Sequence, residues 1–80
     1  MGALHQGRRM FTWGDTVIVT SDAPAHMRPG SLASVVGVTS PQERRGSHFE
    51  QFPAGTIYLV EFGDGEALDI HENMLKIPES

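Results

Sequence analysis

The stretch TIYLVEFGDGEALDI, residues 56–70, decides the fold. Residues 56–62 are rich in β-branched and aromatic side chains and are too few for a stable helix, so they predict a strand. Gly63-Asp64-Gly65 follows directly. This sequence is typical of a tight β-hairpin, because glycine accepts the positive φ angles that such turns require. Residues 66–70 are therefore expected to return as the second strand of the hairpin.

Successive side chains of a strand point to opposite faces of its sheet. One alternating set in the first strand is fully apolar and is expected to face the core: Tyr58, Val60 and Phe62. This assignment places Ile57 and Leu59 outside, where they would form an exposed apolar surface. In the second strand, the side chains expected to point inward are Leu68 and Ile70.

Three more strands are expected at residues 16–21, 31–39 and 75–77. Pro29-Gly30 suits a type II turn, Gly37 suggests a bulge, and residues 71–74 suggest one helical turn. Residues 40–55 form one long loop. This order predicts an all-β domain, a five-stranded SH3-like barrel over residues 11–77. Residues 1–10 are interpreted as a flexible tail and residues 78–80 as a short end.

Composition limits the functions open to the chain. Its 80 residues suffice for one domain, and the absence of cysteine excludes disulfides and thiolate metal sites. The net charge is −4, and residues 56–80 carry six acids against the single base Lys76. Such a surface repels phosphate, so we expect no nucleic acid partner, and no apolar run is long enough to span a membrane. We expect a cytoplasmic protein with a protein partner or with self-association as a homo-oligomer.

No catalytic residue, metal site or cofactor is predicted. The four histidines, His5, His26, His48 and His71, are widely spaced and lack the pairing of a zinc motif. No serine lies in a nucleophile elbow, and no glycine-rich loop precedes a helix to hold phosphate. The acids near the hairpin are interpreted as a solvated face. These observations favour a non-enzyme.

The aromatic residues give the best candidates for a binding surface. The long loop contains His48, Phe49 and Phe52, and aromatics in a loop tend to pack against something. Trp13, at the entry to the first strand, is expected to be a barrel plug or an interface residue. Together with Ile57 and Leu59 on the expected outer face, these residues form the predicted binding set.

Phe11-Thr12-Trp13-Gly14-Asp15-Thr16-Val17, Val35-Val36-Gly37 and Tyr58-Leu59-Val60-Glu61-Phe62 resemble segments of SH3-like barrel proteins. That group includes a small barrel protein of photosystem I, small nitrogen-fixation accessory proteins and immunity proteins of bacterial toxin systems. The resemblance covers residues 11–77 and implies the barrel fold. It also suggests an accessory or immunity protein from a mobile bacterial element.

A narrower resemblance is to the type II dihydrofolate reductases carried on plasmids and integrons. Phe11, Gly14, Asp15 and Val17 match the Phe-x-x-Gly-Asp-x-Val entry of that family. Those enzymes are tetramers around a central pore, whose active strand reads Val-Gln-Ile-Tyr. The nearest match here is Leu68-Asp69-Ile70-His71. The resemblance implies a homo-oligomer with these four residues as an alternative pore strand.

Three hypotheses therefore follow from the sequence. The first is a non-catalytic protein-interaction module, the second a homo-oligomeric enzyme of the folate-reductase type, and the third a self-assembling structural barrel with its interface at Trp13, Ile57 and Leu59. We favour the first.

Overall fold

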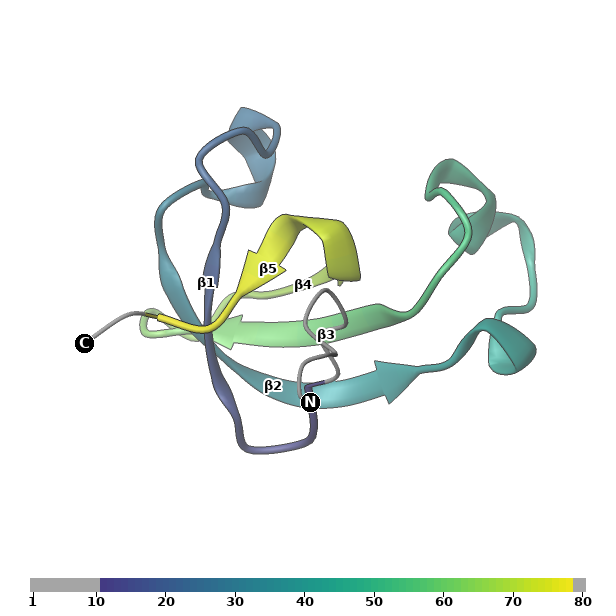
Figure 1. Cartoon of the computed structure of the whole chain (residues 1–80), viewed down its shortest axis with the longest axis horizontal. Coiled ribbons are helices and arrows are strands. Elements are labelled where there is room, and N and C mark those ends of the chain that lie inside the picture. The colour runs from purple at the N-terminus through teal and green to yellow at the C-terminus, as the bar shows by residue number, and fades with distance from the viewer. Residues whose placement is uncertain (1–10, 79–80) are drawn as a thin grey trace, which may run out of the picture.

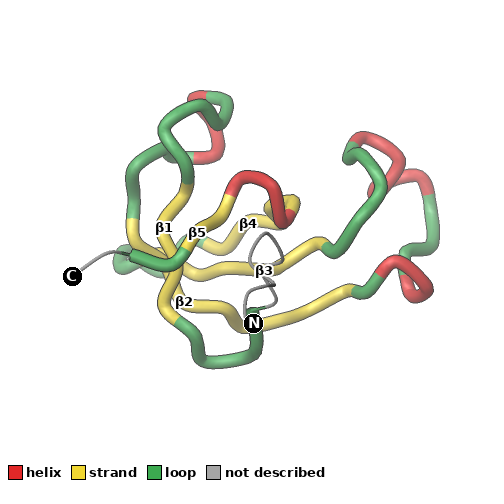
Figure 2. The backbone as a smooth tube through the Cα atoms, viewed as in Figure 1, coloured by secondary structure: helices red, strands yellow, loops and turns green. Residues whose placement is uncertain are grey.

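The computed structural model describes residues 11–78 and shows an all-β protein (Figures 1 and 2). Its strands are β1 (Thr16–Val19), β2 (Leu32–Thr39), β3 (Ile57–Phe62), β4 (Ala67–His71) and β5 (Leu75–Lys76). They form one antiparallel sheet in the order β4-β3-β2-β1-β5, which confirms the predicted five strands. The expected ends at residues 1–10 and 79–80 lie outside the described residues.

Short 3₁₀ turns fill the connections between the strands: η2 (Ala25–Met27), η3 (Pro41–Glu43), η4 (Ser47–Gln51) and η5 (Glu72–Met74). The last of these is the helical turn expected before the closing strand. β4 and β5 are the two edges of the sheet, and η5 joins them. Figure 1 shows β1 crossing β2 and β3 steeply, so the sheet bends around its core.

The predicted turns and bulge are confirmed. Phe62 N–H donates to the Glu66 carbonyl at 2.8 Å across the hairpin, where Gly65 has a φ of 93°. Ser31 N–H donates to the Arg28 carbonyl at 3.2 Å, as the turn through Pro29-Gly30 requires. The register of β2 against β3 shifts between Val35 and Gly37, and bulges of this kind increase the local bend of a sheet.

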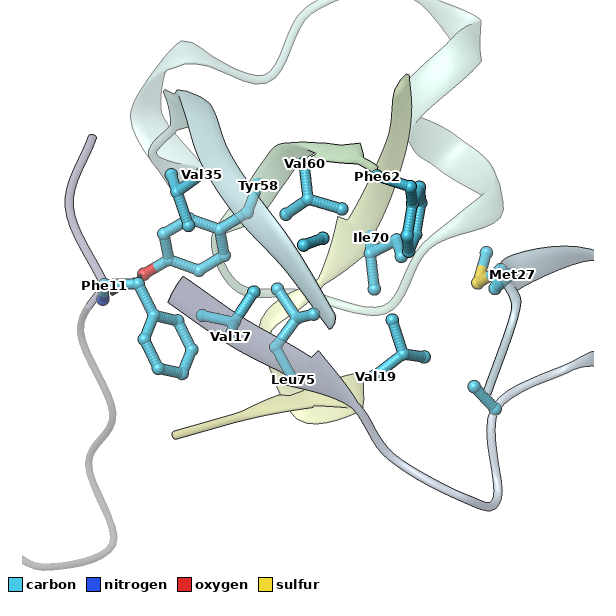
Figure 3. Packing of buried hydrophobic residues seen from close by; sticks show 12 residues of the cluster. Phe11, Val17, Val19, Met27, Val35, Tyr58, Val60, Phe62, Ile70 and Leu75 are labelled. Atoms are coloured by element: carbon cyan, nitrogen blue, oxygen red, sulfur yellow. Dashed lines mark hydrogen bonds between the residues drawn. The ribbon is translucent and has the colours of Figure 1, made fainter. Parts of the chain in front are cut away.

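The core lies on the inner face of the sheet (Figure 3). Tyr58, Val60 and Phe62 are buried as predicted, Ile70 is buried with them, and Leu68 packs against the cluster. Other large members of the cluster are Phe11, Val17, Val19, Met27, Val35 and Leu75. The Tyr58 hydroxyl accepts a hydrogen bond from Phe11 N–H at 3.1 Å, and the two rings meet edge to face at 5.2 Å. This contact fixes the chain ahead of β1 to the core.

The expectation that Ile57 lies on an exposed outer face is wrong, because its side chain is 0% exposed. His71 is the cross-strand neighbour of Ile57 and shares its face. The Nε2–H of His71 donates to the carbonyl of Ala54 at 2.8 Å, so the long loop lies over this face. Leu59, on the same face, is half-buried. Strand alternation predicted the face correctly, whereas the covering loop decided the exposure.

Arg44 organises the long loop between β2 and β3. Its guanidinium donates to four carbonyls, those of Phe49 at 2.6 Å, Pro53 at 2.6 Å, Gly55 at 2.9 Å and Phe52 at 3.0 Å. Half-buried carbonyls need partners, and one planar donor here supplies three of them together with the exposed carbonyl of Pro53. The loop is thus folded around a single side chain.

The base of this loop is joined to η5. Gly55 has a φ of 133°, and a Cβ at this position would lie 2.8 Å from His71 Nε2. Thr56 N–H donates to Glu72 Oε1 at 2.7 Å, while Glu72 N–H donates to the Thr56 carbonyl at 3.0 Å. His71 Nδ1 accepts from Asn73 N–H at 3.0 Å, so both ring nitrogens of this buried histidine are bonded.

Candidate functional site

A groove of about 300 Å³ lies beside β4, between η2 and η4. We call it the edge groove. It is lined by His26, Met27, His48, Gln51, Phe52, Leu59, Ala67, Leu68 and Asp69. Three separate segments thus supply its walls: the β1–β2 connection, the long loop, and the β3–β4 hairpin.

The edge groove straddles the edge of the sheet. Leu68 is the cross-strand neighbour of Val60, so it lies on the inner face, whereas Asp69 pairs with Leu59 on the outer face. A hollow lined by side chains from both faces of a terminal strand must pass around its open side. Within residues 11–78, β4 pairs with β3 alone.

The hydrogen-bond phase of β4 determines which of its backbone groups face the groove. Bonded and non-bonded pairs alternate along an antiparallel ladder. Phe62 N–H bonds to Glu66 at one end of the ladder and Glu72 N–H bonds to Thr56 at the other, so residues 66, 68, 70 and 72 direct their backbone groups toward β3. Ala67 and Asp69 therefore direct their N–H and C=O groups away from β3, on the side of the groove.

The long loop forms the outer wall through His48. Its Nε2 lies 2.8 Å from Asp69 Oδ2, which ties η4 to β4. The imidazole ring meets Phe49 edge-on at 4.9 Å and Phe52 at 6.0 Å. Gln51 Nε2 donates to the His48 carbonyl at 2.8 Å. This wall is polar at its rim and aromatic behind it.

Arg28 fixes the opposite wall. It follows η2 with a left-handed φ of 61°, and its Nη1 lies 3.0 Å from Asp64 Oδ1 and 2.9 Å from Glu66 Oε1. The guanidinium carbon also lies 4.4 Å from the centre of the Phe62 ring. The hydrogen bond with Asp64 raises the pKa of Arg28, and the hydrogen bond from Arg28 lowers the pKa of Asp64. The β1–β2 connection is thus clipped to the hairpin that leads into β4.

The structure brings together part of the predicted binding set and part of the alternative pore strand. The predicted residues that line the edge groove are His48, Phe52, Leu59, Leu68 and Asp69. Phe49 lies instead in a separate hollow of the loop with Arg44. Ile57, Ile70 and His71 are buried inside the single chain, so they offer no surface to a ligand or a pore.

Trp13 is not part of the edge groove. Its side chain is 71% exposed, which excludes the plug role and leaves it as a surface residue. The sequence did not point to the other groove residues, His26, Met27, Gln51 and Ala67. No local sequence pattern distinguishes these residues, because each lines the groove only after segments that are distant in the chain come together. The free side of β4 could have been foreseen from the strand order alone.

The edge groove presents imidazole, amide, carboxylate and apolar side chains. The described residues contain no cluster of three side chains suited to hold a metal ion, and none of their buried side-chain polar atoms lacks a hydrogen-bond partner. Residues 11–78 contain no helix long and apolar enough to cross a membrane. No protein-family model matches the chain, and no curated protein or solved structure is significantly similar to it.

Proposed function

We propose that this protein is an interaction module that binds an extended peptide segment of a partner protein along β4. One observation carries the proposal: the backbone groups of Ala67 and Asp69 face a groove walled by side chains from both faces of the strand. A peptide added to a sheet edge gains main-chain hydrogen bonds, and flanking pockets select alternate side chains.

The geometry of the edge groove supports one side-chain pattern for the bound segment. Residues directly opposite one another on neighbouring strands share a face. A peptide side chain opposite Leu68 therefore enters the inner side, near Met27 and the core. Side chains opposite Ala67 and Asp69 reach the outer side, near Leu59 and His48. An apolar peptide residue opposite Leu68, with polar residues or a mixture of polar and apolar residues on either side of it, therefore fits the inner and outer sides of the groove.

Charge favours a basic segment. The chain carries a net charge of −4. Asp64 and Glu66 lie in the hairpin just ahead of β4, where they share the single partner Arg28 and so leave one net negative charge, and Asp69 lies in the groove. Complementary charge speeds encounter and suppresses wrong partners more than it adds affinity. Lysine or arginine residues flanking the apolar position are thus the expected mark of a partner.

Replacing Ala67 tests the proposal. Proline lacks the N–H that faces the groove, and at this position it removes no bond to β3, so A67P should fold but lose the docking donor. The matched control is A67V, which keeps the N–H. The probe is a synthetic peptide of alternating valine and threonine flanked by lysines, titrated into ¹⁵N-labelled protein.

We expect the peptide to shift the amide signals near Ala67 and Asp69 in the wild type and in A67V. A67V should bind the peptide within about twofold of the wild-type affinity. A67P should bind it at least about tenfold more weakly, since main-chain hydrogen bonds carry much of such affinity. Equal binding by A67P and A67V, or shifts confined to another surface, would overturn the proposal.

An accessory or immunity role, as the sequence resemblance suggests, is the biological setting we propose for this binding. The partner would then be encoded nearby. The test is to co-purify the chain with the product of an adjacent gene: capture that A67P abolishes supports the setting, and capture that A67P leaves unchanged speaks against it.

A further inference from the structure

The outer face of β5, β1, β2 and β3 carries a second surface, separate from the edge groove. Leu32 is 57% exposed at its centre. A hollow of about 520 Å³ on one side of Leu32 is lined by Ile18, Gly30, Leu32, Lys76 and Pro78. A hollow of about 270 Å³ on its other side is lined by Thr16, Leu32, Ala33, Ser34, Glu61, Phe62 and Gly63. Leu32 is thus an apolar ridge between two hollows.

Strand register arranges this face in two rows. Ile18 pairs with both Leu32 and Lys76, which gives the row Lys76, Ile18, Leu32 across β5, β1 and β2. Ser34 pairs with both Thr16 and Glu61, which gives the row Thr16, Ser34, Glu61 across β1, β2 and β3. A base therefore stands at one end of the face and an acid at the other. We call Ile18, Leu32, Glu61 and Lys76 the outer-face patch.

We propose that the outer-face patch binds a second copy of this chain. A two-fold axis lying between β1 and β2, along the strands, exchanges the two halves of the face. It sets Ile18 of one copy against Leu32 of the other and Thr16 against Ser34. Lys76 on β5 then lies across the gap of about 10 Å between the facing sheets from β3 of the other copy, and two residues along the strand from Glu61, a separation that two long side chains span. Every contact occurs twice, as an isologous interface requires.

Charge complementarity singles out this occupant. Lys76 and Glu61 are three strand spacings apart, about 14 Å, so they are too far apart to pair within one chain. A turned second copy satisfies both charges at once and seats each Leu32 ridge against the hollow that Ile18 lines. Because the sheet bends, the contact area is small, and we infer a weak dimer that forms with rising concentration.

The test is sedimentation of the full chain over a concentration series reaching about 1 mM, with folding checked by circular dichroism; micromolar to millimolar dissociation is the range for small interfaces. L32D should abolish the dimer, because it places two carboxylates at the centre of the contact. The control V38D changes a residue that is 43% exposed on the same strand but outside the patch, and it should leave the dimer intact.

Charge exchange sharpens the test. K76E and E61K each bring like charges together and should weaken the dimer by about three- to tenfold, the scale of exposed charge pairs. The double variant K76E/E61K restores opposite charges in the other order and should recover wild-type association. A wild type that stays monomeric throughout, or a double variant no better than the single ones, would overturn the proposal. Neither result bears on the edge groove, which contains none of these four residues.

Discussion

At the scale of the residue, Arg44 shapes the edge groove without lining it. Its four hydrogen bonds to loop carbonyls hold η4 in place. Of the groove residues, His48 lies in η4 and Phe52 follows directly after it. We expect R44Q to lower the free energy of unfolding by about 2 kcal/mol, the scale of losing hydrogen bonds to a half-buried charged group. Denaturant unfolding measures this loss. Amide hydrogen exchange should rise in residues 46–55, and peptide binding should weaken with it.

The control is R45Q, which removes the same charge from the exposed neighbour. It should change stability by no more than about 0.5 kcal/mol, as surface substitutions generally do. If R44Q and R45Q behave alike, the loop does not depend on the guanidinium.

Gly55 is the second residue on which the loop depends. Its φ of 133° suits glycine, and an added Cβ would lie 2.8 Å from His71 Nε2 and 3.1 Å from Glu72 Oε1. G55A should therefore cost about 3 kcal/mol of unfolding free energy, since backbone strain and a clash with buried side chains combine. The comparison is G46A, where φ is 89° but nothing lies within 4 Å, so strain acts alone. Thermal unfolding should rank G46A clearly above G55A; equal losses would show that the close approach is unimportant.

At the scale of the element, the clip between Arg28 and the hairpin predicts a pH dependence. The hydrogen bond from Arg28 holds the pKa of Asp64 below its ordinary value of 3.8. A carboxyl whose folded pKa is depressed stabilises the fold above its unfolded pKa, and this contribution is lost as the pH falls through the folded pKa. Wild-type Tm should thus fall more steeply than that of R28Q as the pH drops below about 4.

Arg28 and Asp64 are largely solvent-accessible, so the expected difference in Tm between wild type and R28Q at acid pH is small. D64N should show the same flattened acid limb as R28Q, and the double variant should add little to either. Parallel Tm curves for wild type and R28Q would show that the clip contributes nothing to stability.

The elements also show what sequence reasoning could reach. The hairpin of β3 and β4 was predictable, because alternation, turn chemistry and inward apolar residues such as Val60 all act locally. The ordered structure of the long loop was not predictable from the sequence. In the sequence Arg44 resembles any solvent-exposed charge, and its role appears only when the loop carbonyls fold around it. Ile57 was misplaced for the same reason. The edge groove was found only in part, because its walls come from three segments far apart in the chain.

At the scale of the whole molecule, the two sheet edges differ. β5 has two residues, and such short edge strands offer little to an added strand. β4 has five residues and leads out of a hairpin whose tip carries Asp64 and Glu66. Of the two sheet edges within residues 11–78, β4 is therefore the one long enough for peptide docking, and the chain as a whole is acidic. The proposed preference for extended basic segments rests on this combination.

The acidic charge of the domain predicts that peptide binding depends on salt concentration. The lysine-flanked peptide should lose affinity as sodium chloride rises from about 50 to 500 mM, by about five- to tenfold, because salt screens charges that lie outside direct contact. A peptide with serines in place of the lysines should bind more weakly at low salt and change by less than about twofold, since main-chain bonds and apolar contacts are screened little. Isothermal titration at each salt concentration measures both peptides. If the two peptides respond equally to salt, the charge of the domain does not select its partner.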